Sequence, residues 1–163
     1  KDFTKVTASA SKYFGLVKAS TLELRLRTGF TDAYGNSGAV PIYERFYAGG
    51  AYTIRGYHER KVGPIDPVSK DPIGGEAMVV GNIEYLYPVM DMIKAGLFYD
   101  VGNVWAKLND FGSSGYKAGI GIGVRLKTPI GPVRLDYGWP LHKEPGEPAK
   151  GKGKLHFSLS RGF

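Results

Sequence analysis

The groups able to do chemistry in this 163-residue sequence are mostly charged side chains, and the most distinctive of them is Arg55. Arg55 belongs to the run R-F-Y-A-G-G-A-Y-T-I-R-G-Y from Arg45 to Tyr57. This run lies in a long irregular segment, roughly residues 31–73, which is too rich in aromatic and aliphatic side chains for a solvated linker. Arg55 stands between an aliphatic residue and a glycine, so its guanidinium should enter a confined place and need a carboxylate there.

Other reactive residue types give no pattern for catalysis or metal binding. The absence of cysteine excludes disulfides and thiolate metal sites. No Ser-His-Asp set is suggested. The nearness of Asp136 to Arg134 is better explained by charged residues on a strand that lines the lumen of a barrel than by catalysis. The glycines of residues 119–123 alternate strictly and precede no helix, which favours tight packing over phosphate binding. The histidines have no ligand-like spacing: His58, His142 and His156. We therefore expect no enzyme activity, no catalytic residue, no metal and no cofactor.

Composition favours a sheet-rich fold and narrows the choice of partners. The chain has 24 Gly, 11 Tyr and 8 Phe, an excess typical of β architectures. The net charge of +7 is spread over many segments, so we expect no nucleic-acid binding. No apolar run reaches the ~20 residues that a membrane helix requires, whereas a barrel strand needs only ~9–11 residues of alternating character.

Polar and apolar residues alternate along most of the chain, which predicts an all-β antiparallel meander of about seven strands with one long loop after the second. Pro88 should end the third strand. An odd number of strands cannot close with an antiparallel seam, so either an extra strand exists at residues 42–47 or sheet edges remain. The expected strands are residues 3–14, 21–31, 76–87, 94–105, 116–127, 133–139 and 154–163.

The two faces of the predicted strands differ sharply. Glu84 and Asp100 share the polar face, given a common sheet. A soluble lipid-binding barrel would point its apolar face inward. The reverse is favoured by glycines on the polar face and by aromatic residues near strand ends, as in membrane barrels. Those aromatic residues are Tyr85, Tyr87, Trp105, Tyr137, Trp139 and Phe163. On the polar face, four arginines should line a pore wall, and the alternative is that some of them face solvent unpaired: Arg25, Arg27, Arg125 and Arg134.

Several motifs together resemble the BamA/TamA superfamily of outer-membrane assembly proteins. They are the run from Arg45 to Tyr57, G-G-E-A-M-V-V-G-N-I-E-Y (residues 74–85), F-Y-D-V-G-N-V-W (98–105), G-I-G-V-R-L-K-T-P-I-G-P-V-R-L-D-Y (121–137) and the closing aromatic. The order matches that of the family and covers most of the chain. Asn103-Val104-Trp105 favours the BamA branch, and Ile54-Arg55-Gly56-Tyr57 suits both branches.

The resemblance implies that the long loop folds back into the barrel lumen. Arg55 would correspond to the loop arginine, with Asp100 as the carboxylate that receives it and Glu84 as a second acidic position. The lumenal loop motif would comprise Arg45, Phe46, Gly49, Gly50, Ile54, Arg55, Gly56 and Tyr57. The seam strand, which closes the barrel against its first strand, would carry Leu155, Phe157, Leu159 and Phe163.

The resemblance also implies a function and a location. The chain would be integral to the bacterial outer membrane and in contact with its lipid. It would belong to a non-enzymatic factor that inserts client β-barrel proteins by strand templating, and assembly lipoproteins would be further partners. A passive outer-membrane channel or translocation barrel is the alternative. Residues 1–163 would be the C-terminal part of a sixteen-stranded barrel, without the periplasmic domains and first strands, inactive alone and able to self-associate through strand edges.

Overall fold

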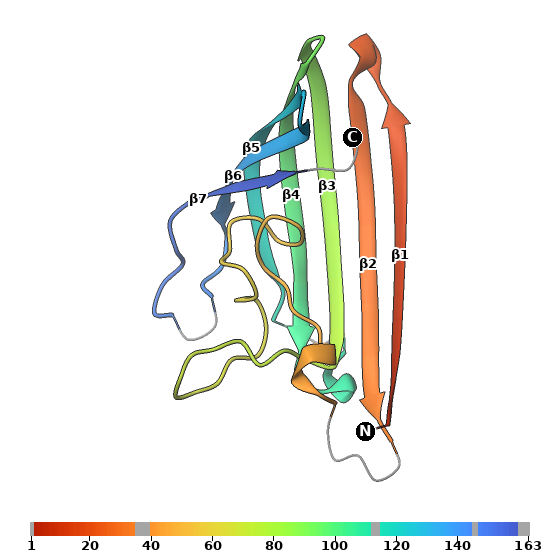
Figure 1. Cartoon of the computed structure of the whole chain (residues 1–163). Coiled ribbons are helices and arrows are strands. Elements are labelled where there is room, and N and C mark those ends of the chain that lie inside the picture. Colours follow the sequence, from red (N-terminus) through yellow and green to blue (C-terminus); the bar gives the residue numbers. More distant parts are fainter. Residues whose placement is uncertain (1, 35–39, 112–114, 145–146, 160–163) are drawn as a thin grey trace.

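The computed structural model describes residues 2–34, 40–111, 115–144 and 147–159, and its regular structure is almost all β (Figure 1). Three single turns of 3-10 helix interrupt the strands: η1 (Val17–Ala19), η2 (Ile42–Glu44) and η3 (Leu108–Asp110). None of the described helices is long and apolar enough to cross a membrane. The strands are β1 (Phe3–Gly15), β2 (Thr21–Ala33), β3 (Ala77–Met90), β4 (Ile93–Trp105), β5 (Lys117–Thr128), β6 (Gly131–Pro140) and β7 (Lys154–Leu159).

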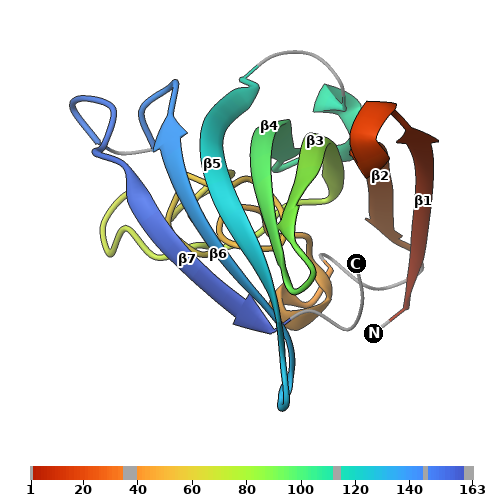
Figure 2. The same ribbon diagram turned by 90° about the horizontal axis from the view of Figure 1, so that it is seen from above.

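The strands form one antiparallel sheet in the order of the sequence, β1 to β7. The sheet curves into an arc that does not close, and the loop between β2 and β3 occupies its concave side (Figure 2). This confirms the predicted meander with one long loop. In the described part of the chain β1 and β7 remain as edges, which is one of the two outcomes expected for an odd number of strands.

Connections of very different length gather at the two ends of the sheet. The hairpins β1–β2, β3–β4 and β5–β6 turn within a few residues at one end. The long segments that follow β2, β4 and β6 lie at the other end (Figure 1). Short turns on one side and long loops on the other are characteristic of outer-membrane barrels.

The outward and inward faces follow the predicted alternation. Leu97, Ile122 and Phe157 lie on the convex face and are exposed, whereas Asp100 lies on the concave face and is 0% exposed. A soluble barrel has the opposite arrangement. The apolar core instead lies between the loop and the concave wall, and consists of Phe46, Ala48, Ile54, Tyr57, Val62, Val80 and Val104.

One sequence prediction about the strands is wrong, and one of two stated alternatives is excluded. β3 continues through Pro88 to Met90, because the register against β4 shifts between these two residues. Proline is tolerated at such an irregularity, where its missing N–H removes no regular ladder bond. Residues 42–47 form no strand: η2 follows Pro41, and only one isolated bridge, Phe46 to Gly75, is present in this stretch.

Candidate functional site

Arg55 is anchored in the wall of the sheet by Asp100 of β4. Its Nε donates to Asp100 Oδ2 at 2.7 Å, a terminal nitrogen donates to Oδ1 at 2.9 Å, and its backbone N–H donates to Oδ2 at 3.0 Å. The guanidinium also stacks 3.8 Å from the ring centroid of Phe98. A bidentate pair with a further backbone bond fixes both the side chain and the main chain of the loop at this point.

Three strands add charges around this pair. Glu84 of β3 accepts from Arg55 at 2.8 Å, and Asp136 of β6 lies 3.4 Å from the same nitrogen. Arg125 of β5 donates to Asp136 at 2.6 Å and also to Glu84. Arg134 lies 3.8 Å from Glu84 and 3.5 Å from Asp136. Three guanidinium groups therefore balance three carboxylates in one buried cluster.

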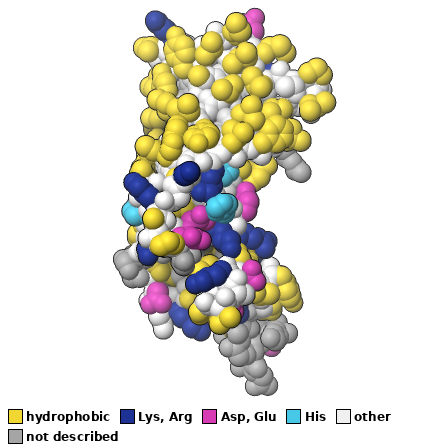
Figure 3. All heavy atoms as spheres, turned by 90° about the vertical axis from the view of Figure 1, so that its left-hand side faces the viewer, with side chains coloured by type: hydrophobic (Ala, Val, Ile, Leu, Met, Phe, Trp, Pro, Cys, Tyr) yellow, Lys and Arg dark blue, Asp and Glu magenta, His cyan; other side chains and the backbone are white. Residues whose placement is uncertain are grey.

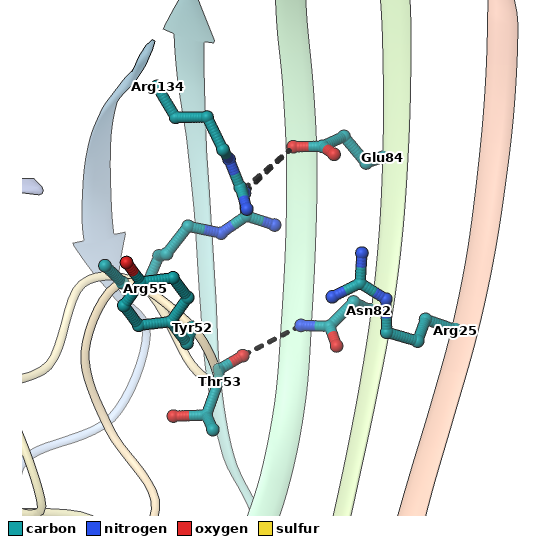
Figure 4. A pocket seen from close by; sticks show the side chains of 8 residues that line it. Arg25, Tyr52, Thr53, Arg55, Asn82, Glu84 and Arg134 are labelled. Atoms are coloured by element: carbon teal, nitrogen blue, oxygen red, sulfur yellow. Dashed lines mark hydrogen bonds and ion pairs between the residues drawn. The ribbon is translucent and has the colours of Figure 1, made fainter. Parts of the chain in front are cut away.

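A small polar pocket adjoins the cluster, and Figure 4 shows Arg55 and Arg134 pointing toward Glu84 across it. On its other side Asn82 donates to the Thr53 carbonyl at 2.8 Å and to Asp100 at 2.7 Å. Asn82 thus connects the wall to the loop beside the main ion pair.

The cluster keeps Arg55 charged. The Arg55 side chain is 4% exposed, and this burial alone would lower the pKa of its guanidinium. The hydrogen bonds and negative charge of Asp100, with the charges of Glu84 and Asp136, outweigh burial and raise that pKa above its ordinary value. A group that stays protonated and fully paired is suited to anchoring the loop and unsuited to proton transfer.

Glycines allow the loop to lie directly on the wall. A Cβ on Gly138 of β6 would stand 2.7 Å from the Gly56 nitrogen, and one on Gly119 of β5 would overlap the Arg55 carbonyl oxygen. Gly56 itself has φ of 101°. A Cβ added to Gly56 would stand 3.0 Å from the backbone of Trp139 and Pro140. Only glycine combines this φ with so close an approach.

Two further side chains hold the loop next to Gly56. The Tyr57 hydroxyl donates to the Ala118 carbonyl of β5 at 2.7 Å and accepts from the backbone N–H of His142 at 3.1 Å. His156 of β7 accepts the Gly56 N–H through Nε2 at 3.0 Å, which requires that nitrogen to be unprotonated. The loop motif is therefore bonded to β3, β4, β5, β6 and β7.

The other residues of the loop motif shape the loop itself. Arg45 donates to the carbonyls of Val40 at 2.9 Å and Ile73 at 3.0 Å, which closes the base of the loop. Gly49 and Gly50 have φ of 110° and 101°, in the left-handed region that glycine favours. Three motif residues belong to the buried core: Phe46, Ile54 and Tyr57.

The expected seam strand is β7, which pairs only with β6, along Val133–Gly138 in the described residues. Its apolar side chains lie on the convex face and are exposed: Leu155, Phe157 and Leu159. Phe163 lies outside the described residues. On the opposite face, His156 is the β7 residue that reaches the loop motif.

Sequence reasoning did not place three of the residues that complete the site in contact with the loop or its ion-pair cluster: Arg125, Asp136 and His156. The alternation of the strands contained the signal, because it places all three on the polar face. Arg125 and Arg134 are paired, so the solvent-facing alternative is wrong for both. Arg25 pairs with Glu23 at 2.9 Å, and Arg27 donates to the Tyr52 carbonyl. Among the described residues, no group of three or more His, Asp or Glu side chains could hold a metal.

The similarity to known proteins extends over the whole chain. The model of the Omp85 superfamily domain matches residues 1–163. An outer membrane protein assembly factor BamA from Nitratidesulfovibrio vulgaris is 34% identical over 165 residues, which cover 99% of this chain and 21% of the relative. The BamA of Neisseria meningitidis serogroup B is 29% identical over 193 residues, covering 99% of this chain and 24% of that protein.

A solved structure agrees with the fold. The crystal structure of BamA from Haemophilus ducreyi lacking POTRA domains 1-3 aligns with a TM-score of 0.79 at 25% identity, over 94% of this chain and 34% of that one. These names agree with the BamA branch favoured by Asn103-Val104-Trp105. The chain spans less than a quarter of the curated relatives and about a third of the solved chain.

Proposed function

Because the chain belongs to the Omp85 superfamily, we propose that it is the C-terminal part of the barrel of a BamA-type factor that assembles proteins in the bacterial outer membrane. The observation that supports this most strongly is the loop motif bound through Arg55 to Asp100 and Glu84 on the concave wall. The convex face, with exposed residues such as Leu97 and Ile122, would contact lipid. The periplasmic domains and first barrel strands of the parent protein would precede this part.

In this proposal the loop is a brace and β7 is a template. The brace holds β3 to β7 in a fixed curvature through the loop, while β7 offers backbone N–H and C=O groups at its free edge. A client strand could add to such an edge by β-augmentation, without any covalent step. The carboxylates of the buried cluster are paired with arginines, which suits a role in holding the loop.

The two edges would have different partners. In the full-length protein β1 would pair with the preceding strand of the same barrel, and β7 would form the seam with the first strand. Client β-barrel proteins would engage that seam, with assembly lipoproteins as further partners. An isolated piece of 163 residues would expose both edges and associate with a second copy through them.

The proposal can be tested by reconstituting the full-length protein in lipid vesicles and adding a urea-denatured client barrel. We expect faster folding of the client than in empty vesicles, measured by its heat-modifiable migration on gels. The isolated 163-residue chain serves as the comparison and should give no acceleration. Ion conductance without accelerated client folding would contradict the proposal and favour a passive channel.

A further inference from the structure

The three short hairpins end in apolar residues that neither the loop nor the sheet covers. We call residues 15–20, 89–92 and 129–130 the hairpin rim. Val17 is 79% exposed and Ile130 is 81% exposed. Turns normally carry Gly, Asn, Asp or Ser, so exposed aliphatic side chains at the tips of successive hairpins require a reason. The other large apolar side chains exposed in the rim are Leu16, Val89, Met90 and Met92.

Neighbouring hairpins of the rim are connected along the sheet. The backbone N–H of Lys127, at the end of β5, donates to the Met92 carbonyl at 2.9 Å, which joins the second hairpin to the third. The register pairs Thr21 with Leu86, which brings the first hairpin beside the second. In Figure 3 hydrophobic side chains cover much of the upper part of the face in view, with a few charged side chains at its top edge, and most charged groups gather lower down.

The rim continues the apolar convex face. Phe14 and Tyr87 are exposed near the ends of their strands, immediately before the first two hairpins. β1 has 13 residues and β3 has 14, more than the ~9–11 residues that cross the hydrocarbon core. The ends of these strands therefore reach the headgroup region, where aromatic residues and lysines are favoured.

Two lysines lie in or next to the rim. Lys18 lies at the tip of the first hairpin, and Lys12 lies on the convex face with its ammonium 5.3 Å from the centroid of the Phe14 ring. Asp91 is the one acidic residue within the rim sequences. A lysine that covers apolar surface with its stem and directs its ammonium outward is suited to a lipid phosphate.

We propose that the hairpin rim inserts into the headgroup region of the membrane leaflet on its side and binds phospholipids with anionic headgroups through Lys12 and Lys18. This rests on the proposed function as an outer-membrane barrel. It adds that the turns are themselves lipid-binding elements, which would hold the barrel at a fixed depth. A polar turn exposed to water could not do this.

The experiment places a single environment-sensitive fluorophore (NBD) on an introduced cysteine of the full-length protein in phosphatidylcholine vesicles. The residues 1–163 contain no cysteine of their own. The rim variants are Val17→Cys and Ile130→Cys. Val68→Cys is the matched control, because Val68 is 91% exposed in the long-loop segment. Leu97→Cys, on the convex face in mid-strand, reports whether the barrel itself is inserted.

We expect lipids with a doxyl group near the headgroup to quench both rim probes, and aqueous iodide to quench the Val68 probe. If lipid quenches the Leu97 probe but iodide quenches the rim probes as it does the Val68 probe, the rim proposal is overturned and the proposed function stays intact. If the Leu97 probe also fails to meet lipid, the proposed function fails as well.

The headgroup preference has its own arm, with doxyl-phosphatidylglycerol compared against doxyl-phosphatidylcholine at the Val17 probe. Each lysine near an anionic surface favours it by about fivefold. The anionic lipid should therefore quench several times more strongly, and the double variant Lys12→Gln with Lys18→Gln should lose this preference. Equal quenching by the two lipids in the protein with both lysines would overturn the assignment of Lys12 and Lys18.

Discussion

Replacing Gly138 by alanine places a methyl group where the loop touches the wall. The added Cβ would stand 2.7 Å from the Gly56 nitrogen and 2.9 Å from the Arg55 carbonyl carbon, both backbone atoms. Ordinary contacts begin at 3.4 Å, so the loop must retreat by about 0.7 Å. The bonds from the backbone nitrogens of Arg55 to Asp100 and of Gly56 to His156, each 3.0 Å, would then exceed the usual range.

The magnitude follows from these two effects. Overpacking costs about 1–3 kcal/mol, and weakened hydrogen bonds add about 1–2 kcal/mol. We expect Gly138→Ala to lower the free energy of unfolding by about 2–5 kcal/mol, measured by urea titration of the full-length protein in vesicles. The matched control is Gly81→Ala on β3, whose Cβ meets its nearest atom at 3.7 Å. Its effect should stay within about 1 kcal/mol. Equal effects of the two substitutions would refute the close seating of the loop.

Two further predictions concern β7 and the convex face. His156→Leu removes the acceptor of the Gly56 N–H and should lower the free energy of unfolding by about 1–3 kcal/mol. The control His156→Gln keeps an acceptor and should lower it less. Equal losses of the two variants in urea titration would contradict this hydrogen bond. Ile122→Lys puts a charge on the face proposed to contact lipid and should lower the free energy of unfolding in vesicles by about 2–4 kcal/mol. The control Val68→Lys, in the long-loop segment, should leave that free energy nearly unchanged. If the protein tolerates both substitutions equally, the assignment of the convex face to lipid is contradicted.

The alternation of residue types was sufficient to predict the strands and the face of each residue. A period of two assigns every side chain to one face without knowledge of its partner strand. This is why Glu84 and Asp100 could be placed on a common polar face from sequence. The same reasoning failed at Pro88, because a shift of register depends on how two strands meet and leaves no periodic signal in either strand.

The composition of the buried cluster was less predictable. Arg125 and Arg134 are expected to line a pore wall when each strand is considered alone. They are paired because the loop carries Arg55 into the concave side and excludes water, so that Glu84 and Asp136 are shared among three arginines. His156 acquires its role from Gly56, which is 100 positions away in the chain. Such contacts arise from the folded loop, which has no periodicity to reveal them.

A double-mutant cycle on Arg55 and Asp100 tests most directly the claim that this ion pair locks the loop to the barrel wall. Arg55→Met and Asp100→Asn should each lower the free energy of unfolding by about 3–5 kcal/mol, because each leaves a buried charged partner incompletely paired. The combined variant should cost less than the sum of the two by at least about 1.5 kcal/mol, measured by urea titration in vesicles. Additivity within about 0.5 kcal/mol would contradict the account.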